Sequence, residues 1–185
     1  MIKELLGDAL TAAKDLLGYK LCFDSPNGLM SGYIVETEAY LEGDPANHAS
    51  RGRTPRTVPM FGPAGTIYVY FTYGMHYCLN IVTGKEGQGQ AVLIRALQPV
   101  EGVEIMKLNR QVDNEFNLTN GPAKLTQALG VDKSYNGTNI WNGPIRLESG
   151  IVPSDIVQTT RIGINQATDM PWRFYIQNNP YISRL

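Results

Sequence analysis

The segment 35–40 of the chain, read Val-Glu-Thr-Glu-Ala-Tyr, carries the side chains best suited to chemistry. Side chains alternate along a strand, so Ile34, Glu36, Glu38 and Tyr40 would share one face, and the intervening residues would form core. Neighbouring carboxylates repel each other, so they belong either on a solvent-facing surface or in a functional site. In a site, they could take part in catalysis. The pattern alone leaves both interpretations open.

A second set of candidates is aromatic, because Tyr68, Tyr70, Tyr73 and Tyr77 lie within ten positions. Strand propensity is sufficient to explain Tyr68 and Tyr77. Tyr73 lies at the expected tip of a hairpin, where an exposed aromatic side chain suits insertion between stacked bases. Tyr40 and Tyr70 would offer ring faces on which a planar base can stack. This pattern favours a partner with flat, aromatic groups.

Basic residues gather where a nucleic-acid partner would need them. Arg51, Arg53 and Arg56 crowd one loop, Arg95 ends an expected strand, and Lys124 stands near the start of an expected helix. Cations and backbone amides at a helix N-terminus can together bind phosphate. Three arginines in a loop are nevertheless a weak signal, because they commonly form only a solvated surface, so they do not by themselves indicate a nucleic-acid binder.

Composition narrows the class of protein. The 185 residues are 43% apolar and 18% charged, with 16 Lys and Arg against 17 Asp and Glu, giving a formal net charge of -1. This apolar fraction excludes a mainly disordered chain. The charge excludes a simple polycation, so any binding of nucleic acid must use a local basic patch. The length favours one domain over residues 1–185.

Cofactor and metal motifs are weak. The sequence contains neither a GxxxxGK[ST] phosphate loop nor a strand-bound GxGxxG, so we expect no cofactor. His76 and Cys78 would share a strand face, and His48 with a carboxylate could complete a metal site. Because CxxC and HxxxH spacings are missing, we favour no metal and a structural role for Cys78. Cys22 and Cys78 both lie in apolar runs, which predicts buried, reduced thiols.

The N-terminal residues bear on where in the cell the protein is located. Charged residues interrupt the apolar ones over residues 1–17, which is typical of an amphipathic helix and not of a signal peptide. No stretch is long and apolar enough to span a bilayer. We therefore expect a cytoplasmic protein without membrane attachment.

The elements that must position these candidates follow from periodicity and turn residues. Together they predict an α+β domain with a mostly antiparallel sheet and one long, ordered loop over residues 42–65. We expect helices over residues 1–17, 101–110 and 122–129, and strands over 19–23, 31–41, 66–72, 76–82, 91–97, 145–148, 159–164 and 172–177.

Taken in order, several segments resemble the alkyladenine (3-methyladenine) DNA glycosylase family. The resemblance implies a single compact α/β domain around a curved antiparallel sheet, in agreement with the pattern above. The matching segments span nearly the whole chain: VETEAY (35–40), NHASRGRTPR (47–56), MFGPAGTIYVY (60–70), YGMHYCLN (73–80), AVLIRALQP (91–99), NGPAKL (120–125), RIGI (161–164) and PWRFY (171–175).

The resemblance implies a role for each matching pocket residue. Glu38 matches the general base that activates water. Asn80 matches the residue that disfavours guanine through its exocyclic amine, and Arg95 matches one that supports the base-binding site. The residues matching those that enclose the extruded base are Tyr40, His48 and Tyr70.

The same resemblance implies how the chain binds its duplex. Tyr73 matches the side chain that fills the gap left by the extruded nucleotide. Asn165 and Gln166 stand where an acidic residue or glycine is more usual, which weakens the expectation of a DNA contact there. The net charge of -1 predicts modest, salt-sensitive binding to undamaged DNA. With Tyr73, the residues expected to contact DNA are Arg51, Arg53, Thr54, Met75 and Lys124.

The implied activity is excision of alkylated, and also deaminated, purines from double-stranded DNA by a monomeric bacterial enzyme. A flipped nucleotide would be hydrolysed at its N-glycosidic bond without strand cleavage. Two alternatives remain. One is a protein of the same fold that recognises lesions without removing them. The other is a β-barrel module that stacks single-stranded nucleic acid on the same tyrosines. A preference for double-stranded over single-stranded DNA would favour the glycosylase or the lesion-recognition protein over the single-strand-binding module.

Overall fold

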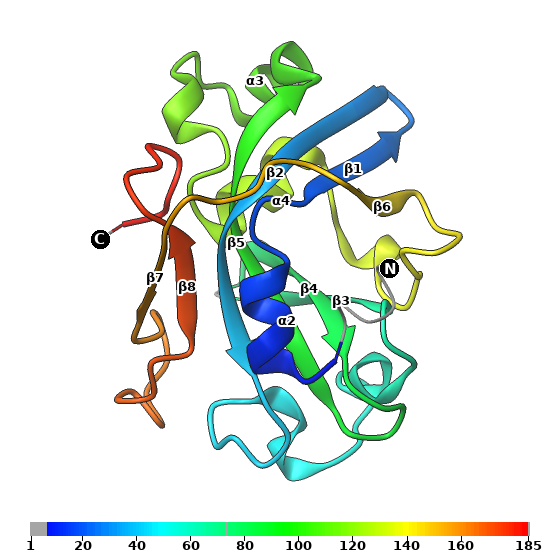
Figure 1. Ribbon diagram of the computed structural model, residues 1–185. Helices are drawn as coiled ribbons and strands as arrows, with labels where there is room; N and C mark the ends of the chain where they lie inside the picture. Colours follow the sequence, from blue (N-terminus) through cyan, green and yellow to red (C-terminus); the bar gives the residue numbers. More distant parts are fainter. Residues whose placement is uncertain (1–6, 73, 185) are drawn as a thin grey trace.

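The computed structural model describes residues 7–72 and 74–184. Within them, eight strands form one curled sheet in which every pairing is antiparallel, accompanied by three α-helices (Figure 1), so the expected α+β class is confirmed. The strands are β1 (Lys20–Ser25), β2 (Gly28–Tyr40), β3 (Ile67–Thr72), β4 (His76–Thr83), β5 (Gln90–Glu101), β6 (Ile145–Glu148), β7 (Ile156–Thr159) and β8 (Arg173–Ile176). The helices are α2 (Ala9–Asp15), α3 (Val103–Arg110) and α4 (Pro122–Leu129), with short 3-10 helices η1 (His48–Arg51), η2 (Val58–Phe61), η3 (Glu115–Asn117) and η4 (Lys133–Tyr135).

Strand β2 is the centre of the fold. The sheet runs in the order β3-β4-β5-β2-β1-β6, and β8 pairs with both β2 and β7. One edge of β2 pairs with β1 over its first half and with β8 at residues 36–38, while the other edge pairs with β5. Residues 36–38 therefore lie between two neighbouring strands, where a side chain can be shielded from solvent on all sides.

Helix α2 covers one face of this sheet. It packs on β2, β5 and β8, and Figure 1 shows it lying across the sheet. Its apolar face, Ala9, Ala12 and Ala13, is fully buried, and the Thr37 hydroxyl donates a hydrogen bond to the Ala13 carbonyl oxygen at 2.7 Å. On the second face of β2, Glu36 and Glu38 are also 0% exposed, so the interpretation of these carboxylates as a solvated surface is wrong.

The alternation along β2 is not regular. Register shifts occur between Ile34 and Glu36 and between Glu36 and Thr37. Ile34, expected on the carboxylate face, joins Val35 in the hydrophobic core. An extra residue in one strand of a pair turns the next side chains, which explains why the predicted face breaks at this point.

The first helix differs from its prediction. The expected helix over residues 1–17 is described only from Gly7 onwards, and the helix there begins at Ala9. Asp8 caps it, because its carboxylate accepts hydrogen bonds from the backbone amides of Leu10 and Thr11 at 3.0 and 3.1 Å. Residues 1–6 lie outside the described part.

The later elements follow the sequence closely, with one exception. α4 and β6 have the predicted bounds, and the long loop is ordered and contains η1 and η2. The strand expected over residues 159–164 is wrong, because β7 ends at Thr159. The backbone amide of Ile162 instead donates to the Glu38 carboxylate, and Gly163 turns with φ +78°. Residues 162–164 form part of a cavity wall, and residues 160–164 do not continue the sheet.

The cysteines agree with expectation, since Cys22 and Cys78 are both buried and free. Burial raises the pKa of the Cys22 thiol to about 11, so it stays protonated. Over residues 7–72 and 74–184, no helix is long and apolar enough to cross a membrane.

Substitutions at two glycines with positive φ can separate the cost of left-handed backbone from the cost of a steric clash. Gly130 ends α4 with φ +72° and has room for a methyl group, whose closest neighbour would be an Asn109 side-chain atom at 3.8 Å. Gly102, before α3, has φ +71°, but a methyl group there would lie 2.6 Å from the Leu29 carbonyl oxygen. Gly130→Ala should therefore reduce the free energy of unfolding by about 1 kcal/mol, the cost of left-handed backbone alone. Gly102→Ala should cost at least about 2 kcal/mol, because overpacking is added. Urea unfolding measures both, and equal losses would contradict the clash.

Candidate active site

A cavity of about 530 Å³ opens on the face of the sheet opposite α2. Its volume is in the range of sites for small organic ligands and is ample for a purine base. Five of the residues predicted for a pocket line it together: Tyr40 from β2, His48 from η1, Tyr70 from β3, Asn80 from β4 and Arg95 from β5.

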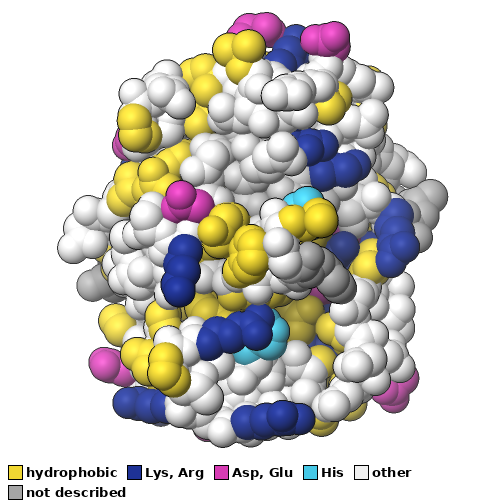
Figure 2. Space-filling model, turned by 180° about the vertical axis from the view of Figure 1, so that it is seen from behind, with side chains coloured by type: hydrophobic (Ala, Val, Ile, Leu, Met, Phe, Trp, Pro, Cys, Tyr) yellow, Lys and Arg dark blue, Asp and Glu magenta, His cyan; other side chains and the backbone are white. Residues whose placement is uncertain are grey.

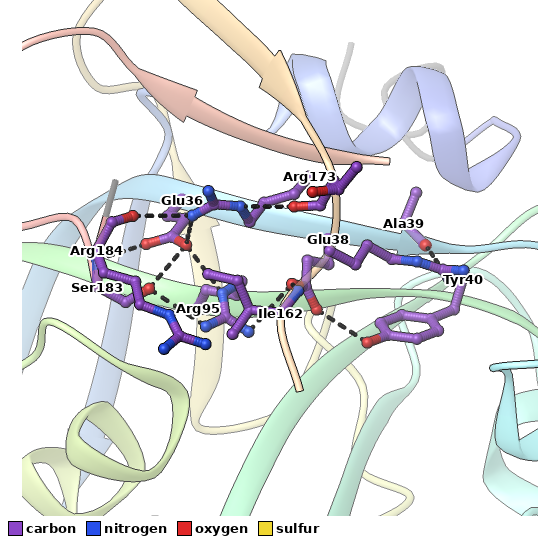
Figure 3. Close-up of polar contacts among 11 residues, drawn as sticks. Glu36, Glu38, Ala39, Tyr40, Arg95, Ile162, Arg173, Ser183 and Arg184 are labelled. Carbon is purple, nitrogen blue, oxygen red and sulfur yellow. Dashed lines mark hydrogen bonds and ion pairs between the residues drawn. The ribbon is translucent and has the colours of Figure 1, made fainter. Parts of the chain in front are cut away.

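Glu38 lies directly behind this lining. Its Oε2 accepts a hydrogen bond from the Tyr40 hydroxyl at 2.9 Å, and its Oε1 accepts one from the Ile162 backbone amide at 2.7 Å (Figure 3). The Arg95 Nη1 is 3.1 Å from the same Oε1. Tyr40, Arg95 and Ile162 all line the cavity. A carboxylate has about four acceptor positions, and three are occupied here, so Oε2 retains one for a further donor such as water.

Arg95 links this carboxylate to a second one. Its Nε donates to Glu36 Oε1 at 2.9 Å, and its Nη2 donates to the Ser183 hydroxyl at 3.2 Å. Glu36 also accepts from Arg173 Nη1 at 2.9 Å. Figure 3 shows Arg95 between the two glutamates, with all three nitrogens of its guanidinium in contact. The direction in which Nη1 points towards Glu38 is therefore set by Glu36 and Ser183.

These charges compensate one another. Burial by itself disfavours the charged guanidinium, but the carboxylates of Glu38 and Glu36 outweigh it and raise the pKa of Arg95 above its ordinary value. Arg173 and Arg95 provide two positive charges beside two negative ones, all almost fully buried. The cluster is formally neutral, which makes its burial tolerable.

Tyr40 is held by a separate buried pair. The Arg161 guanidinium lies 4.7 Å from the centre of the Tyr40 ring and 4.9 Å from that of Trp172. It also forms an ion pair with Asp44, with Nη2 3.0 Å from Oδ1, and donates to the Ala39 carbonyl oxygen at 3.0 Å. Burial and the neighbouring Glu38 carboxylate raise the pKa of Tyr40, so the phenol keeps its proton and donates it.

His48 and two tyrosines form another part of the wall. The His48 Nδ1 is 3.1 Å from the Tyr68 hydroxyl, and its ring meets the Tyr70 ring edge-on at 4.5 Å. Arg56 lies over Tyr70, 5.3 Å from the ring centre. Partial burial of the imidazole and, secondarily, the Arg56 charge lower the pKa of His48, although the residue as a whole is exposed. The imidazole is therefore neutral near pH 7.

Asn80 and Cys78 complete the floor of the cavity. The Asn80 amide nitrogen donates to the Tyr68 carbonyl oxygen at 3.0 Å, which fixes the orientation of its side chain. Burial raises the pKa of the Cys78 thiol, so it remains protonated. Among the described residues, no three His, Cys, Asp or Glu side chains gather closely enough to hold a metal.

Comparison with known proteins decides the family. The sequence profile of the family described as methylpurine-DNA glycosylase (MPG) matches residues 3–180. A protein of Methanoculleus marisnigri is 50% identical over 182 residues, covering 96% of this chain and 94% of its own. One of Carboxydothermus hydrogenoformans is 53% identical over 180 residues, with coverage of 96% and 94%. Both are named "Putative 3-methyladenine DNA glycosylase". This chain belongs to the methylpurine-DNA glycosylase family.

The expected family is thereby confirmed, and with it the class of reaction. Methylpurine-DNA glycosylases are hydrolases that act on N-glycosyl bonds in base excision repair, and their substrate is DNA. The chemistry of the cavity agrees with this class, because a buried carboxylate and aromatic rings are grouped where a base and its sugar can enter.

The described residues that were expected to touch DNA are not among those that line the cavity. Arg51, Arg53 and Thr54 are exposed in the long loop, and Met75 is 69% exposed at the end of the β3–β4 hairpin. Lys124 is half-buried, with its amine 2.7 Å from the Asn120 side-chain oxygen. Figure 2 shows the face behind that of Figure 1, where Lys and Arg side chains are spread among apolar ones. Tyr73 lies outside the described residues.

Several residues of this glycosylase site were not predicted. Tyr68, which the pattern assigned to ordinary strand packing, is 1% exposed, lines the cavity and contacts His48. Its place on the same strand face as Tyr70 was a usable signal. The contacts of Arg161, Arg173 and Ser183 join segments more than a hundred residues apart in sequence from β2, and no local pattern indicates them.

The ionisation of His48 can be tested directly. Its imidazole should titrate below the ordinary histidine value of about 6.5 in an NMR pH titration. Arg56→Ala should move this pKa upwards, because it removes the secondary of two causes, while desolvation remains. Arg146→Ala, on the distant β6, removes an equal charge and should leave it unchanged. An Arg56→Ala pKa equal to that of the unsubstituted protein would contradict this electrostatic account.

Proposed function

We propose that this enzyme flips alkylated and deaminated purines out of duplex DNA, hydrolyses the N-glycosidic bond with a water activated by Glu38, and leaves the abasic strand uncut. The observation that carries the proposal is the position of Glu38, fully buried yet bonded to three groups that line the cavity. A carboxylate held there can accept a proton from water and stabilise positive charge on the sugar.

The hydrogen bonds to Glu38 support this role. The donors Tyr40, Arg95 and Ile162 fix the direction of the carboxylate, and the remaining acceptor position on Oε2 would bond the water. That water would lose a proton to Glu38 as its oxygen bonds to the anomeric carbon. The purine would leave with the electron pair of the broken bond. A methylated, cationic purine leaves as a neutral base.

The cavity walls support binding of a flat base. Tyr40 and Tyr70 present ring faces, and His48 is neutral. Stacking on such faces is worth roughly 1–3 kcal/mol per base, and a cationic purine gains further attraction to the π-electrons. Asn80 lines the cavity with its amide fixed by the Tyr68 carbonyl oxygen, so it would disfavour guanine by occupying space that the exocyclic amine needs.

The nucleophiles available at the cavity support the proposal that the strand stays uncut. Cleavage coupled to base release needs an amine that forms an imine with the sugar. Among the described residues that line the cavity, none is a lysine. The group nearest the expected position of the sugar is the Glu38 carboxylate, which directs the reaction towards water.

Base flipping needs a side chain that occupies the vacated space in the duplex. We assign this role to Tyr73, whose hairpin is flanked by the apolar side chains of Phe71, 49% exposed, and Met75, 69% exposed. Exposed apolar groups at a strand connection, on a surface that carries cations, are suited to entering a base stack.

The first test of this proposal is Glu38→Gln. The substitution keeps the shape and removes the negative charge, so single-turnover release of hypoxanthine and of 3-methyladenine from duplex DNA should fall at least about 100-fold. Binding to lesion-containing duplex should survive, because the walls remain. Alkaline treatment should be needed to cut the product strand, since the enzyme itself leaves it intact.

Glu104→Gln is the matched control, because this glutamate side chain is 83% exposed on α3, away from the cavity. Its release rates should equal those of the unsubstituted enzyme. Release by Glu38→Gln at the normal rate would refute the assigned base. Tight lesion binding by the unsubstituted protein with no release would instead favour the damage-recognition alternative.

The pH dependence should differ between two kinds of lesion. Release of a cationic methylpurine needs only an ionised Glu38, so its rate should rise with pH and then level off. Release of neutral hypoxanthine also needs protonation of the purine, so its rate should pass through a maximum. Single-turnover profiles on matched duplexes measure both, and identical shapes would refute a separate proton for the neutral lesion.

A further inference from the structure

The segment that follows β8 is tied into the buried charge cluster. The Ser183 backbone amide donates to Glu36 Oε2 at 2.6 Å, and its hydroxyl is 2.9 Å from Glu36 Oε1. The Arg184 carbonyl oxygen accepts a hydrogen bond from Arg173 Nη1 at 3.0 Å. These contacts fix the backbone of residues 183–184 against β2 and β8, although both residues lie beyond the stretch 3–180 matched by the family profile.

This anchoring places the Arg184 side chain at the active site. Arg184 lines the same cavity as Arg95, and Figure 3 shows both guanidinium groups extending to the same side of β2. The charge of Arg95 is balanced by Glu36 and Glu38. For Arg184, which is exposed, no carboxylate within the described ranges lies at ion-pair distance. A cation at the edge of a cavity, with no carboxylate partner among the described residues, is suited to an anionic part of the ligand.

The order of groups along β2 indicates which part of a nucleotide that would be. Glu36, Glu38 and Tyr40 follow one another on the strand, and Arg184 is anchored at the Glu36 end. Figure 3 accordingly shows Tyr40 and Arg184 on opposite sides of Glu38. If the base stacks on Tyr40 and the sugar lies at Glu38, as in the proposed function, the chain of the nucleotide continues towards Arg184.

We propose that Arg184 binds a backbone phosphate next to the flipped nucleotide, so that base, sugar and phosphate each meet their own group along β2. The inference rests on the proposed function, because it assumes that Tyr40 receives the base. A guanidinium can form two parallel hydrogen bonds to phosphate oxygens. Glu36 is then a positioning residue, since it holds Ser183, the chain neighbour of Arg184, and Arg173, which donates to the Arg184 carbonyl oxygen.

The test compares salt dependence on two duplexes. One carries a single hypoxanthine nucleotide with a 2′-fluorine, which slows base release by destabilising positive charge on the sugar, and the other is undamaged. Arg184→Ala should bind the lesion duplex about tenfold more weakly and lower the slope of log K against log salt by about 0.9, the loss of one phosphate contact. On the undamaged duplex, where no nucleotide is flipped, its slope should match that of the unsubstituted enzyme.

Two variants serve as controls. Lys133→Ala also removes one exposed cation, in η4 and outside the cavity lining, and should not lower the slope selectively on the lesion duplex. Arg184→Lys keeps the charge, so it should retain the slope and lose only part of the affinity.

Neutral methylphosphonate linkages locate the contact. Placed in turn on the 5′ and 3′ sides of the lesion, one of them should weaken binding by the unsubstituted enzyme about tenfold and leave Arg184→Ala unaffected. Equal salt slopes for Arg184→Ala and the unsubstituted enzyme on the lesion duplex would overturn the inference. It would also be overturned if every methylphosphonate linkage weakened binding by Arg184→Ala as much as it weakens binding by the unsubstituted enzyme. Failure of the unsubstituted enzyme to release base from the unfluorinated duplex would overturn the proposed function alone.

Discussion

A guanidinium placed between two buried carboxylates is the interaction on which the site depends. Glu36 and Glu38 stand two residues apart on one strand and are both excluded from solvent, an arrangement that repulsion and desolvation would oppose. Arg95 reaches both from β5, and Arg173 reaches Glu36 from β8. Four charges that sum to zero can be buried together where two could not. The strand order β5-β2-β8 is what brings them together, so topology and electrostatics are inseparable here.

The cluster also explains why distant segments converge on β2. Loop 161–164 is held at two points, by the Ile162 amide on Glu38 and by the buried pair of Arg161 with Asp44. Residues 183–184 are held by Glu36 and Arg173. Because an unpaired buried charge costs several kcal/mol, these segments are constrained more strongly than apolar contact alone would constrain them. Glu38 is thereby fixed by partners from both edges of its strand, which is the preorganisation that a general base requires.

The elements that could be predicted from the sequence were those marked by a local pattern of residue types. The alternating run over residues 66–72 became β3, and Pro122 with Gly130 marked both ends of α4. The pairing of two glutamates with a tyrosine located the chemistry, although their burial could not be read from it, since burial depends on β8 and on residues 183–184, far away in sequence. The strand expected over residues 159–164 failed for the same reason. In this segment, the Ile162 backbone amide bonds to the Glu38 side chain of β2. Local strand propensity carries no information about such a distant partner.

Two guanidinium groups close to Tyr40 and Glu38 would oppose the binding of a cationic base, and carboxylates offset the charge of both. A methylated purine carries a positive charge, yet Arg95 lines the cavity and Arg161 lies against the Tyr40 ring. Both guanidinium groups have carboxylate partners, so little of their field reaches the space where a base stacks. His48 follows the same logic, because its lowered pKa keeps it neutral in contact with Tyr70. A protonated imidazole at that position would add a charge that no described carboxylate balances. Neutrality of the histidine is therefore part of how this cavity can admit a cationic base, and it costs nothing when the base is neutral.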